Sequence, residues 1–107
     1  MKELKDMTYG IVGLGIMGGS IAKAIRANVL DIPDAHGKIL ACDISTQALA
    51  MAKDGGIVDE TFASADAGAM VSKCDLVYVC LYPHATLDFM KAHKAEFKSG
   101  AVVSDIS

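Results

Sequence analysis

Three glycines stand at a spacing that suits the binding of a phosphate group. Gly13, Gly15 and Gly18 form a G-x-G-x-x-G pattern between an apolar run and a segment of helical character. The first glycine allows a tight turn, the second lets a pyrophosphate approach the backbone, and the third lets the helix pack closely on the strand. The first N–H groups of such a helix have no intrahelical partner and can bind an anion. The spacing therefore predicts a dinucleotide site.

An acidic residue is placed to hold the adenosine ribose of that dinucleotide. Asp43 ends the second apolar run, 25 residues after Gly18, where an acid can accept hydrogen bonds from the ribose hydroxyls. Its negative charge would repel a 2′-phosphate, so we predict NAD rather than NADP as the cofactor. The alternative is a solvated turn aspartate, or a helix cap that competes with Ser45.

A third segment is expected at the nicotinamide end of the cofactor. Leu81, Tyr82 and Pro83 follow the clearest strand pattern in the chain, beside the crevice where open α/β sheets bind ligands. We find no nucleophile–base arrangement and no histidine at ligand spacing from a cysteine, so we predict no catalytic residue and no metal site. The predicted cofactor-binding residues are Gly13, Leu14, Gly15, Ile16, Met17, Gly18, Asp43, Ile44, Ser45, Leu81, Tyr82 and Pro83.

The elements that must position these residues alternate along the chain. Apolar runs predict strands over 8–14, 38–42, 57–58, 75–81 and 101–104, and helical patterns cover 17–27, 46–53 and 83–97, with 63–73 either a helix or a loop. Such alternation implies parallel strands joined by right-handed crossovers. We expect an α/β fold, a doubly wound parallel sheet of Rossmann type. Its first strand is central, with the second and third strands on one side and the fourth and fifth on the other.

Composition and charge narrow the class of protein. The chain has 107 residues, 52% of them hydrophobic, and a mean hydropathy of +0.37, which fits one globular domain with a filled core. A net charge of −3 gives no reason to expect a nucleic-acid partner, and no apolar run predicts a membrane helix. The N-terminus has no signal-peptide pattern and the three cysteines form no C-x-x-C pair, so we expect a cytoplasmic protein with reduced thiols.

Several segments together resemble one enzyme family. Residues 13–20 read G-L-G-I-M-G-G-S, residues 74–83 read C-D-L-V-Y-V-C-L-Y-P, and residues 98–107 read K-S-G-A-V-V-S-D-I-S. These runs resemble the glycine turn, the fourth strand and the fifth strand of the prephenate dehydrogenases. The similarity spans essentially the whole chain.

The resemblance implies an activity that this chain would share with a second domain. Prephenate dehydrogenases oxidatively decarboxylate prephenate to 4-hydroxyphenylpyruvate and pass a hydride to NAD in tyrosine biosynthesis. In that family a helical domain carries the catalytic histidine, the substrate-binding arginines and most of the dimer interface. We therefore expect residues 1–107 to be the dinucleotide-binding half of a homodimeric enzyme, and alone to be a monomer without turnover.

Three other readings remain open from the sequence. A 3-hydroxyacid dehydrogenase or a pyrroline-carboxylate reductase has a similar glycine turn, although Gly19 and Ser20 favour the first resemblance. A nucleotide-sensing regulatory module of a transporter would have about this length and would be a stable dimer. A methyltransferase that uses S-adenosylmethionine also has an acid after its second strand, but its ligand has no pyrophosphate for Gly18 to serve.

Overall fold

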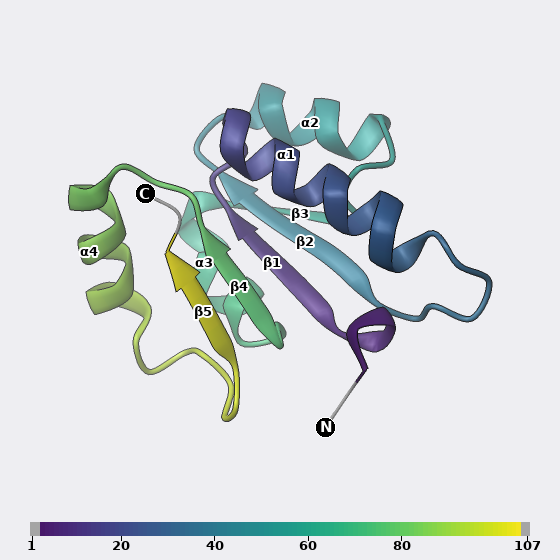
Figure 1. Ribbon diagram of the computed structural model, residues 1–107. Coiled ribbons are helices and arrows are strands. Elements are labelled where there is room, and N and C mark those ends of the chain that lie inside the picture. The colour runs from purple at the N-terminus through teal and green to yellow at the C-terminus, as the bar shows by residue number, and fades with distance from the viewer. Residues whose placement is uncertain (1–2, 106–107) are drawn as a thin grey trace.

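The computed structural model describes residues 3–105 and contains one five-stranded parallel sheet (Figure 1). The strand order is β3-β2-β1-β4-β5, which confirms the predicted doubly wound topology with the first strand at the centre. All strands are parallel, so their carboxyl ends meet at one edge of the sheet. The strands are β1 (Thr8–Val12), β2 (Lys38–Asp43), β3 (Glu60–Ala63), β4 (Leu76–Val79) and β5 (Val102–Asp105).

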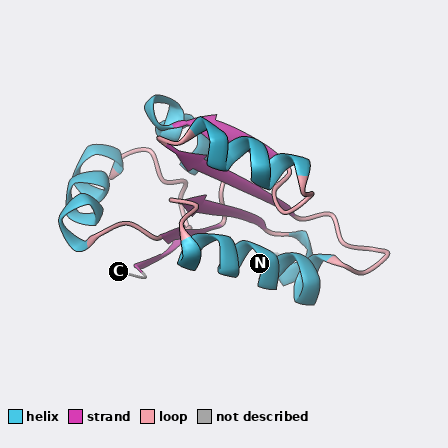
Figure 2. Cartoon of the chain, turned by 90° about the horizontal axis from the view of Figure 1, so that it is seen from above, coloured by secondary structure: helices cyan, strands magenta, loops and turns pink. Residues whose placement is uncertain are grey.

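Helices cover both faces of the sheet, as the views from the front and from above show (Figures 1 and 2). Residues of α1 and α2 pack in one hydrophobic cluster, and residues of α3 and α4 pack in the other. The helices are α1 (Ile16–Ile25), α2 (Thr46–Asp54), α3 (Ala67–Val71) and α4 (Pro83–His93), with short turns η1 (Leu4–Asp6), η2 (Arg26–Leu30) and η3 (Ser64–Asp66).

The central strand divides its side chains between the two clusters. Ile11 is fully buried on the α1 side, and Val12 points to the α3 side, as the two-residue period of a strand requires. In β2, Cys42 also faces the α3 side, where it is 3% exposed among apolar neighbours and packs as a small hydrophobic residue. A sheet that is buried on both faces fixes the strand ends and the turns that follow them.

The third strand lies later in the chain than predicted. It spans Glu60–Ala63 and pairs with β2, whereas Ile57 and Val58 precede it. Ile57 and Val58 are apolar because they pack in the α1-side cluster rather than in a strand, and Val58 is only 3% exposed there. The strand itself lies at the sheet edge, with the burial of its side chains alternating between half-buried and exposed, so it lacks the continuous apolar run of the inner strands.

Two helix predictions need correction. The helix predicted to end at residue 27 instead continues as a π-helical turn to Leu30, with the Asn28 side chain donating to the Ala24 carbonyl. The i, i+4, i+8 spacing of Met17, Ile21 and Ile25 predicts one buried face, but Met17 is 54% exposed. The buried stripe is formed by Gly18, Ala22 and Ile25. Small residues on that stripe let α1 lie close to the sheet.

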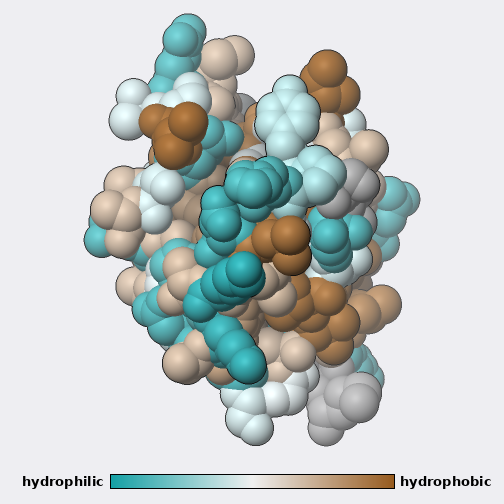
Figure 3. Space-filling view, turned by 90° about the vertical axis from the view of Figure 1, so that its left-hand side faces the viewer, coloured by the Kyte–Doolittle hydropathy of each residue, from teal (hydrophilic) through white to brown (hydrophobic). Residues whose placement is uncertain are grey.

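The side of the molecule that carries α4 presents a mixed surface. Figure 3 shows hydrophilic and apolar residues interspersed on this side, and Leu87 of α4 is 60% exposed. The same helix ends at His93, four residues before the predicted end at Phe97. Over residues 3–105, no helix combines the length and the apolar composition that a membrane crossing needs.

Candidate functional site

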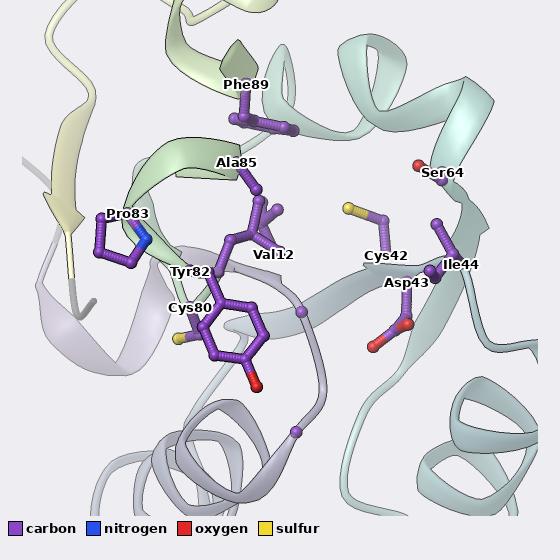
Figure 4. Close-up of a pocket in the computed structure, with 13 residues that line it drawn as sticks. Val12, Cys42, Asp43, Ile44, Ser64, Cys80, Tyr82, Pro83, Ala85 and Phe89 are labelled. Carbon is purple, nitrogen blue, oxygen red and sulfur yellow. The ribbon is translucent and has the colours of Figure 1, made fainter. Parts of the chain in front are cut away.

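A cleft of about 700 Å³ opens at the carboxyl edge of the sheet, between the ends of β1, β2 and β4. This is the point where the strand order reverses, at which open α/β sheets bind ligands. Figure 4 shows residues from the end of β2 on one side of the cleft and Tyr82 and Pro83 across from them. The lining residues are Val12, Gly13, Gly15, Cys42, Asp43, Ile44, Ser64, Cys80, Leu81, Tyr82, Pro83, Ala85 and Phe89.

Gly13 forms the tight turn between β1 and α1. Its φ angle of +95° lies in the region that residues with a Cβ rarely adopt. A Cβ at this position would stand 2.8 Å from the carbonyl oxygen of Cys80. The Gly13 N–H donates to the carbonyl of Cys42 at 3.0 Å, so the turn is held against the end of β2. Only glycine meets both the conformational and the steric requirement here.

Gly18 and Gly15 lack side chains for opposite reasons. A Cβ on Gly18 would lie 1.9 Å from the carbonyl oxygen of Gly13, so this glycine serves the contact between α1 and the turn. A Cβ on Gly15 would meet no atom within 4 Å. Gly15 lines the cleft, and the space beside it is available to a ligand. The close contact at Gly18 is the one predicted from the spacing of the glycines, and the open space at Gly15 leaves room for the predicted pyrophosphate.

The N-terminus of α1 is open to an anion. Its N-cap is Gly15, which has no side chain to accept from the first N–H groups, and the first turn contains no acidic residue. The helix dipole adds about half a positive charge at this end. A phosphate beside Gly15 would therefore meet unpartnered N–H groups, with no acidic side chain in the first turn of the helix.

Asp43 is fixed in place by two backbone hydrogen bonds. Its Oδ2 accepts from the N–H of Leu14 at 2.7 Å, and its Oδ1 accepts from the N–H of Ser45 at 2.8 Å. The carboxylate is half-buried and lines the cleft beside Ile44. Each carboxylate oxygen can accept more than one hydrogen bond, so Asp43 can still accept from a hydroxyl group in the cleft.

The opposite wall is formed by the segment between β4 and α4. Pro83 is the first residue of α4, and Tyr82 is its N-cap with a side chain that is 87% exposed. Leu81 packs against the glycine turn, because its Cδ2 would lie 3.1 Å from a Cβ on Gly13. The hydroxyl of Thr86 donates to the carbonyl of Leu81 at 3.3 Å. This wall is thus tied to both α4 and the turn.

Two cysteines line the cleft as neutral thiols. Burial, with a smaller contribution from the charge of Asp43, raises the pKa of Cys42 to about 12. Burial, with a smaller contribution from the charge of Asp105, also raises the pKa of Cys80. A thiol with a raised pKa is a poor nucleophile at neutral pH, so these side chains add apolar surface to the cleft rather than reactivity.

The structure brings together seven of the predicted residues: Gly13, Gly15, Asp43, Ile44, Leu81, Tyr82 and Pro83 line the cleft. Leu14 and Ile16 instead line a shallower hollow between α1 and α2. Met17 is exposed, Gly18 is buried behind the turn, and the Ser45 hydroxyl caps α2 by accepting from the N–H of Ala48. Cofactor binding by all twelve residues stays a prediction.

Sequence reasoning missed several lining residues, namely Val12, Cys42, Ser64, Cys80, Ala85 and Phe89. Val12, Cys42 and Cys80 lie near the ends of predicted strands. Their position at the carboxyl edge could therefore have been predicted from the sequence. Phe89 reaches the cleft from α4, and Ser64 begins the turn after β3. Nothing in their local sequence distinguishes them from ordinary helix and loop residues.

Solved structures with the same fold include dehydrogenases. Prephenate dehydrogenase from A. aeolicus, in complex with hydroxyphenyl propionate and NAD⁺, matches 97% of this chain with 30% identity and a TM-score of 0.80. Synechocystis arogenate dehydrogenase matches 94% with 19% identity and a TM-score of 0.78. Scyllo-inositol dehydrogenase from Lactobacillus casei, with bound NAD(H) and scyllo-inositol, matches 94% with 24% identity and a TM-score of 0.71.

These matches cover only part of the larger proteins. The chain spans 34% of the A. aeolicus enzyme, 33% of the Synechocystis enzyme and 27% of the L. casei enzyme. No family model matches the chain, and no curated protein sequence does. At 19% and 24% identity, the second and third matches bear on the fold alone. The chain thus has the Rossmann fold of dinucleotide-dependent dehydrogenases, and its predicted resemblance to the prephenate dehydrogenases is confirmed over the length of this chain.

Proposed function

We propose that this chain binds NAD in the cleft at the carboxyl edge of its sheet and is the cofactor-binding domain of a prephenate dehydrogenase. The observation that carries the proposal is the junction of Gly15 and α1. There, an uncapped helix N-terminus without acidic residues faces a space that a side chain on Gly15 would occupy. That junction suits a pyrophosphate, whose charge and close approach it would accommodate.

The position of Asp43 supports NAD over NADP. Its carboxylate is held at the cleft by Leu14 and Ser45, where it can accept from the ribose hydroxyls. A 2′-phosphate on the same ribose would place further negative charge beside that carboxylate. The A. aeolicus enzyme, which is 30% identical, was crystallised with NAD⁺, which supports the same choice of cofactor.

The wider reaction belongs to the proposal as well. When bound, NAD would accept a hydride from prephenate, which yields 4-hydroxyphenylpyruvate, CO₂ and NADH in the cytoplasmic synthesis of tyrosine. The role of this chain is to bind and orient the cofactor. We propose that a helical domain of the full enzyme supplies the groups that bind prephenate. The same domain would form most of the interface of a homodimer. The partial coverage of the A. aeolicus chain supports this division.

Calorimetric titration of the 107-residue chain with NAD and with NADP tests the cofactor assignment. We expect one NAD per chain. NADP should bind at least about tenfold more weakly, because its 2′-phosphate would meet the negative charge of Asp43. Tighter binding of NADP would overturn the role of Asp43. Absence of binding by either dinucleotide would overturn the proposed function itself.

The oligomeric state separates this proposal from a nucleotide-sensing module. Size-exclusion chromatography with light scattering should show a monomer, both with and without NAD, because the proposal places the dimer interface in the helical domain. A stable dimer of this chain would favour the sensing module instead.

A further inference from the structure

Thr86 is a buried threonine directly behind the wall of the cleft. It lies in the first turn of α4 and is 4% exposed; among residues 3–105, the only other hydroxyl-bearing residue buried to this extent is Tyr9. Polar side chains in protein interiors are nearly always hydrogen-bonded. The hydrogen-bond acceptor of the buried hydroxyl therefore indicates which part of the chain this side chain holds in place.

Thr86 donates two hydrogen bonds, both to residues that line the cleft. Its hydroxyl donates to the carbonyl of Leu81 at 3.3 Å, and its N–H donates to the carbonyl of Tyr82 at 2.9 Å. The second bond is the ordinary bond of a first helical turn. The first is specific to a hydroxyl side chain, and it sets the orientation of the peptide group between Leu81 and Tyr82.

That peptide group has a polar atom to offer on its other side. The bond is trans, so the N–H of Tyr82 points opposite to the Leu81 carbonyl and away from Thr86. No group in the described part of the chain accepts a hydrogen bond from this N–H. Leu81 and Tyr82 both line the cleft, so the oriented peptide places a backbone donor at its wall.

The glycine turn on the facing side is held by other contacts. Gly13 donates to the carbonyl of Cys42, and Leu14 donates to the carboxylate of Asp43. Neither bond involves α4. A change at Thr86 should therefore alter the wall at the end of β4 while the site for the pyrophosphate and the adenosine ribose keeps its geometry.

We propose that Thr86 is a positioning residue for the nicotinamide half of the cofactor, an inference that rests on the proposed binding of NAD. The end of β4 belongs to the second mononucleotide-binding half of a doubly wound sheet. By fixing the Leu81–Tyr82 peptide, Thr86 presents the N–H of Tyr82 and the side chain of Leu81 to that half of the dinucleotide.

Binding of NAD is compared with binding of ADP in wild type, Thr86→Val and Thr86→Ser, each as the 107-residue chain. ADP has the adenosine and the diphosphate but no nicotinamide nucleotide. Thr86→Val keeps the shape of the side chain and removes the hydroxyl, so we expect about tenfold weaker NAD binding and ADP binding within about twofold of wild type. Thr86→Ser keeps the hydroxyl and should restore NAD binding to within about threefold of wild type.

Each outcome of this comparison decides something. Equal losses of NAD and ADP affinity in Thr86→Val would assign Thr86 a general structural role and overturn the inference, as would unchanged NAD affinity. If wild type itself fails to bind NAD, the proposed function fails, which is a separate result. Thermal unfolding of each variant shows that it is folded; if Thr86→Val is not, Thr86→Ala is the hydroxyl-free variant to be compared with Thr86→Ser.

Discussion

The carboxylate of Asp43 accepts a hydrogen bond of 2.7 Å from the backbone N–H of Leu14, which joins the acid at the end of β2 to the glycine turn after β1. A second bond, from the N–H of Ser45, holds the other carboxylate oxygen. The position of the acid relative to Gly13 and Gly15 is therefore set by the fold before any ligand arrives. Such preorganisation lowers the cost of ordering a binding site.

Replacement of Asp43 by asparagine should weaken NAD binding and remove the discrimination against NADP. The amide oxygen can accept from only one of the two N–H groups, Leu14 or Ser45, and the charge that strengthens hydrogen bonds from ribose hydroxyls is lost. We expect about tenfold weaker NAD binding, since a hydrogen bond to a charged group contributes about 1.5–3 kcal/mol and a neutral one less. Calorimetry with both dinucleotides measures the ratio of the two affinities.

Asp54→Asn is the matched control for that experiment. Asp54 is exposed at the end of α2 and does not line the cleft, so its replacement makes the same change in net charge elsewhere. It should leave both affinities unchanged. A loss of NAD affinity as large as that of Asp43→Asn would mean that net charge, rather than the ribose contact, sets the affinity.

A methyl group added at Gly18 or at the adjacent Gly19 should have opposite effects on stability. Gly18→Ala would force a Cβ to within 1.9 Å of the Gly13 carbonyl oxygen, whereas Gly19→Ala meets open space. We expect Gly18→Ala to lower the free energy of unfolding by about 1–3 kcal/mol and Gly19→Ala to raise it by about 0.5–1 kcal/mol. Urea unfolding of both variants measures this; equal stabilities would show that the close contact between α1 and the turn is absent.

The buried thiols predict how stability changes at high pH. Burial raises the pKa of Cys42 and of Cys74 from an ordinary value of 9.0 to about 12. In the unfolded chain these thiols ionise at a lower pH than in the folded chain. Their contribution to stability is therefore present below pH 9 and is lost as the pH rises toward 12. The free energy of unfolding should fall over this range, and less steeply in a Cys42→Ala, Cys74→Ala double variant. Equal slopes in the two proteins would contradict the assignment.

The sheet topology was predictable because each crossover follows a simple physical rule. Strands that alternate with helices must be parallel, and the position of the glycine turn after the first strand places that strand at the centre. The third strand was not predictable in place: its residues, including Glu60 and Thr61, pair only with β2 at the sheet edge. The apolar pair Ile57 and Val58 belongs to the core without being a strand.

The candidate site was predictable where backbone conformation dictates the residue type. Gly13 and Gly18 follow from a positive φ angle and a close approach, both of which leave a mark in the sequence. Phe89 and Thr86 reach the cleft wall only because α4 packs beside the end of β4. Their roles depend on contacts between different segments of the chain. No pattern in the local sequence predicts such contacts.

The most direct test of the central claim is the binding of NAD to Gly15→Ala beside the wild type. Gly15 is the N-cap of α1 with a φ angle of −71°, and an added Cβ meets no atom, so the variant should lose no more than about 1 kcal/mol of stability. The methyl group would occupy the space proposed for the pyrophosphate, while Gly19→Ala adds the same group outside the cleft lining.

In calorimetric titrations we predict that wild type and Gly19→Ala bind one NAD per chain with similar affinity. Gly15→Ala should bind it more than about tenfold more weakly, because one steric clash of this kind costs more than about 1.4 kcal/mol. Binding of NAD by a folded Gly15→Ala variant as tightly as by wild type would contradict the account.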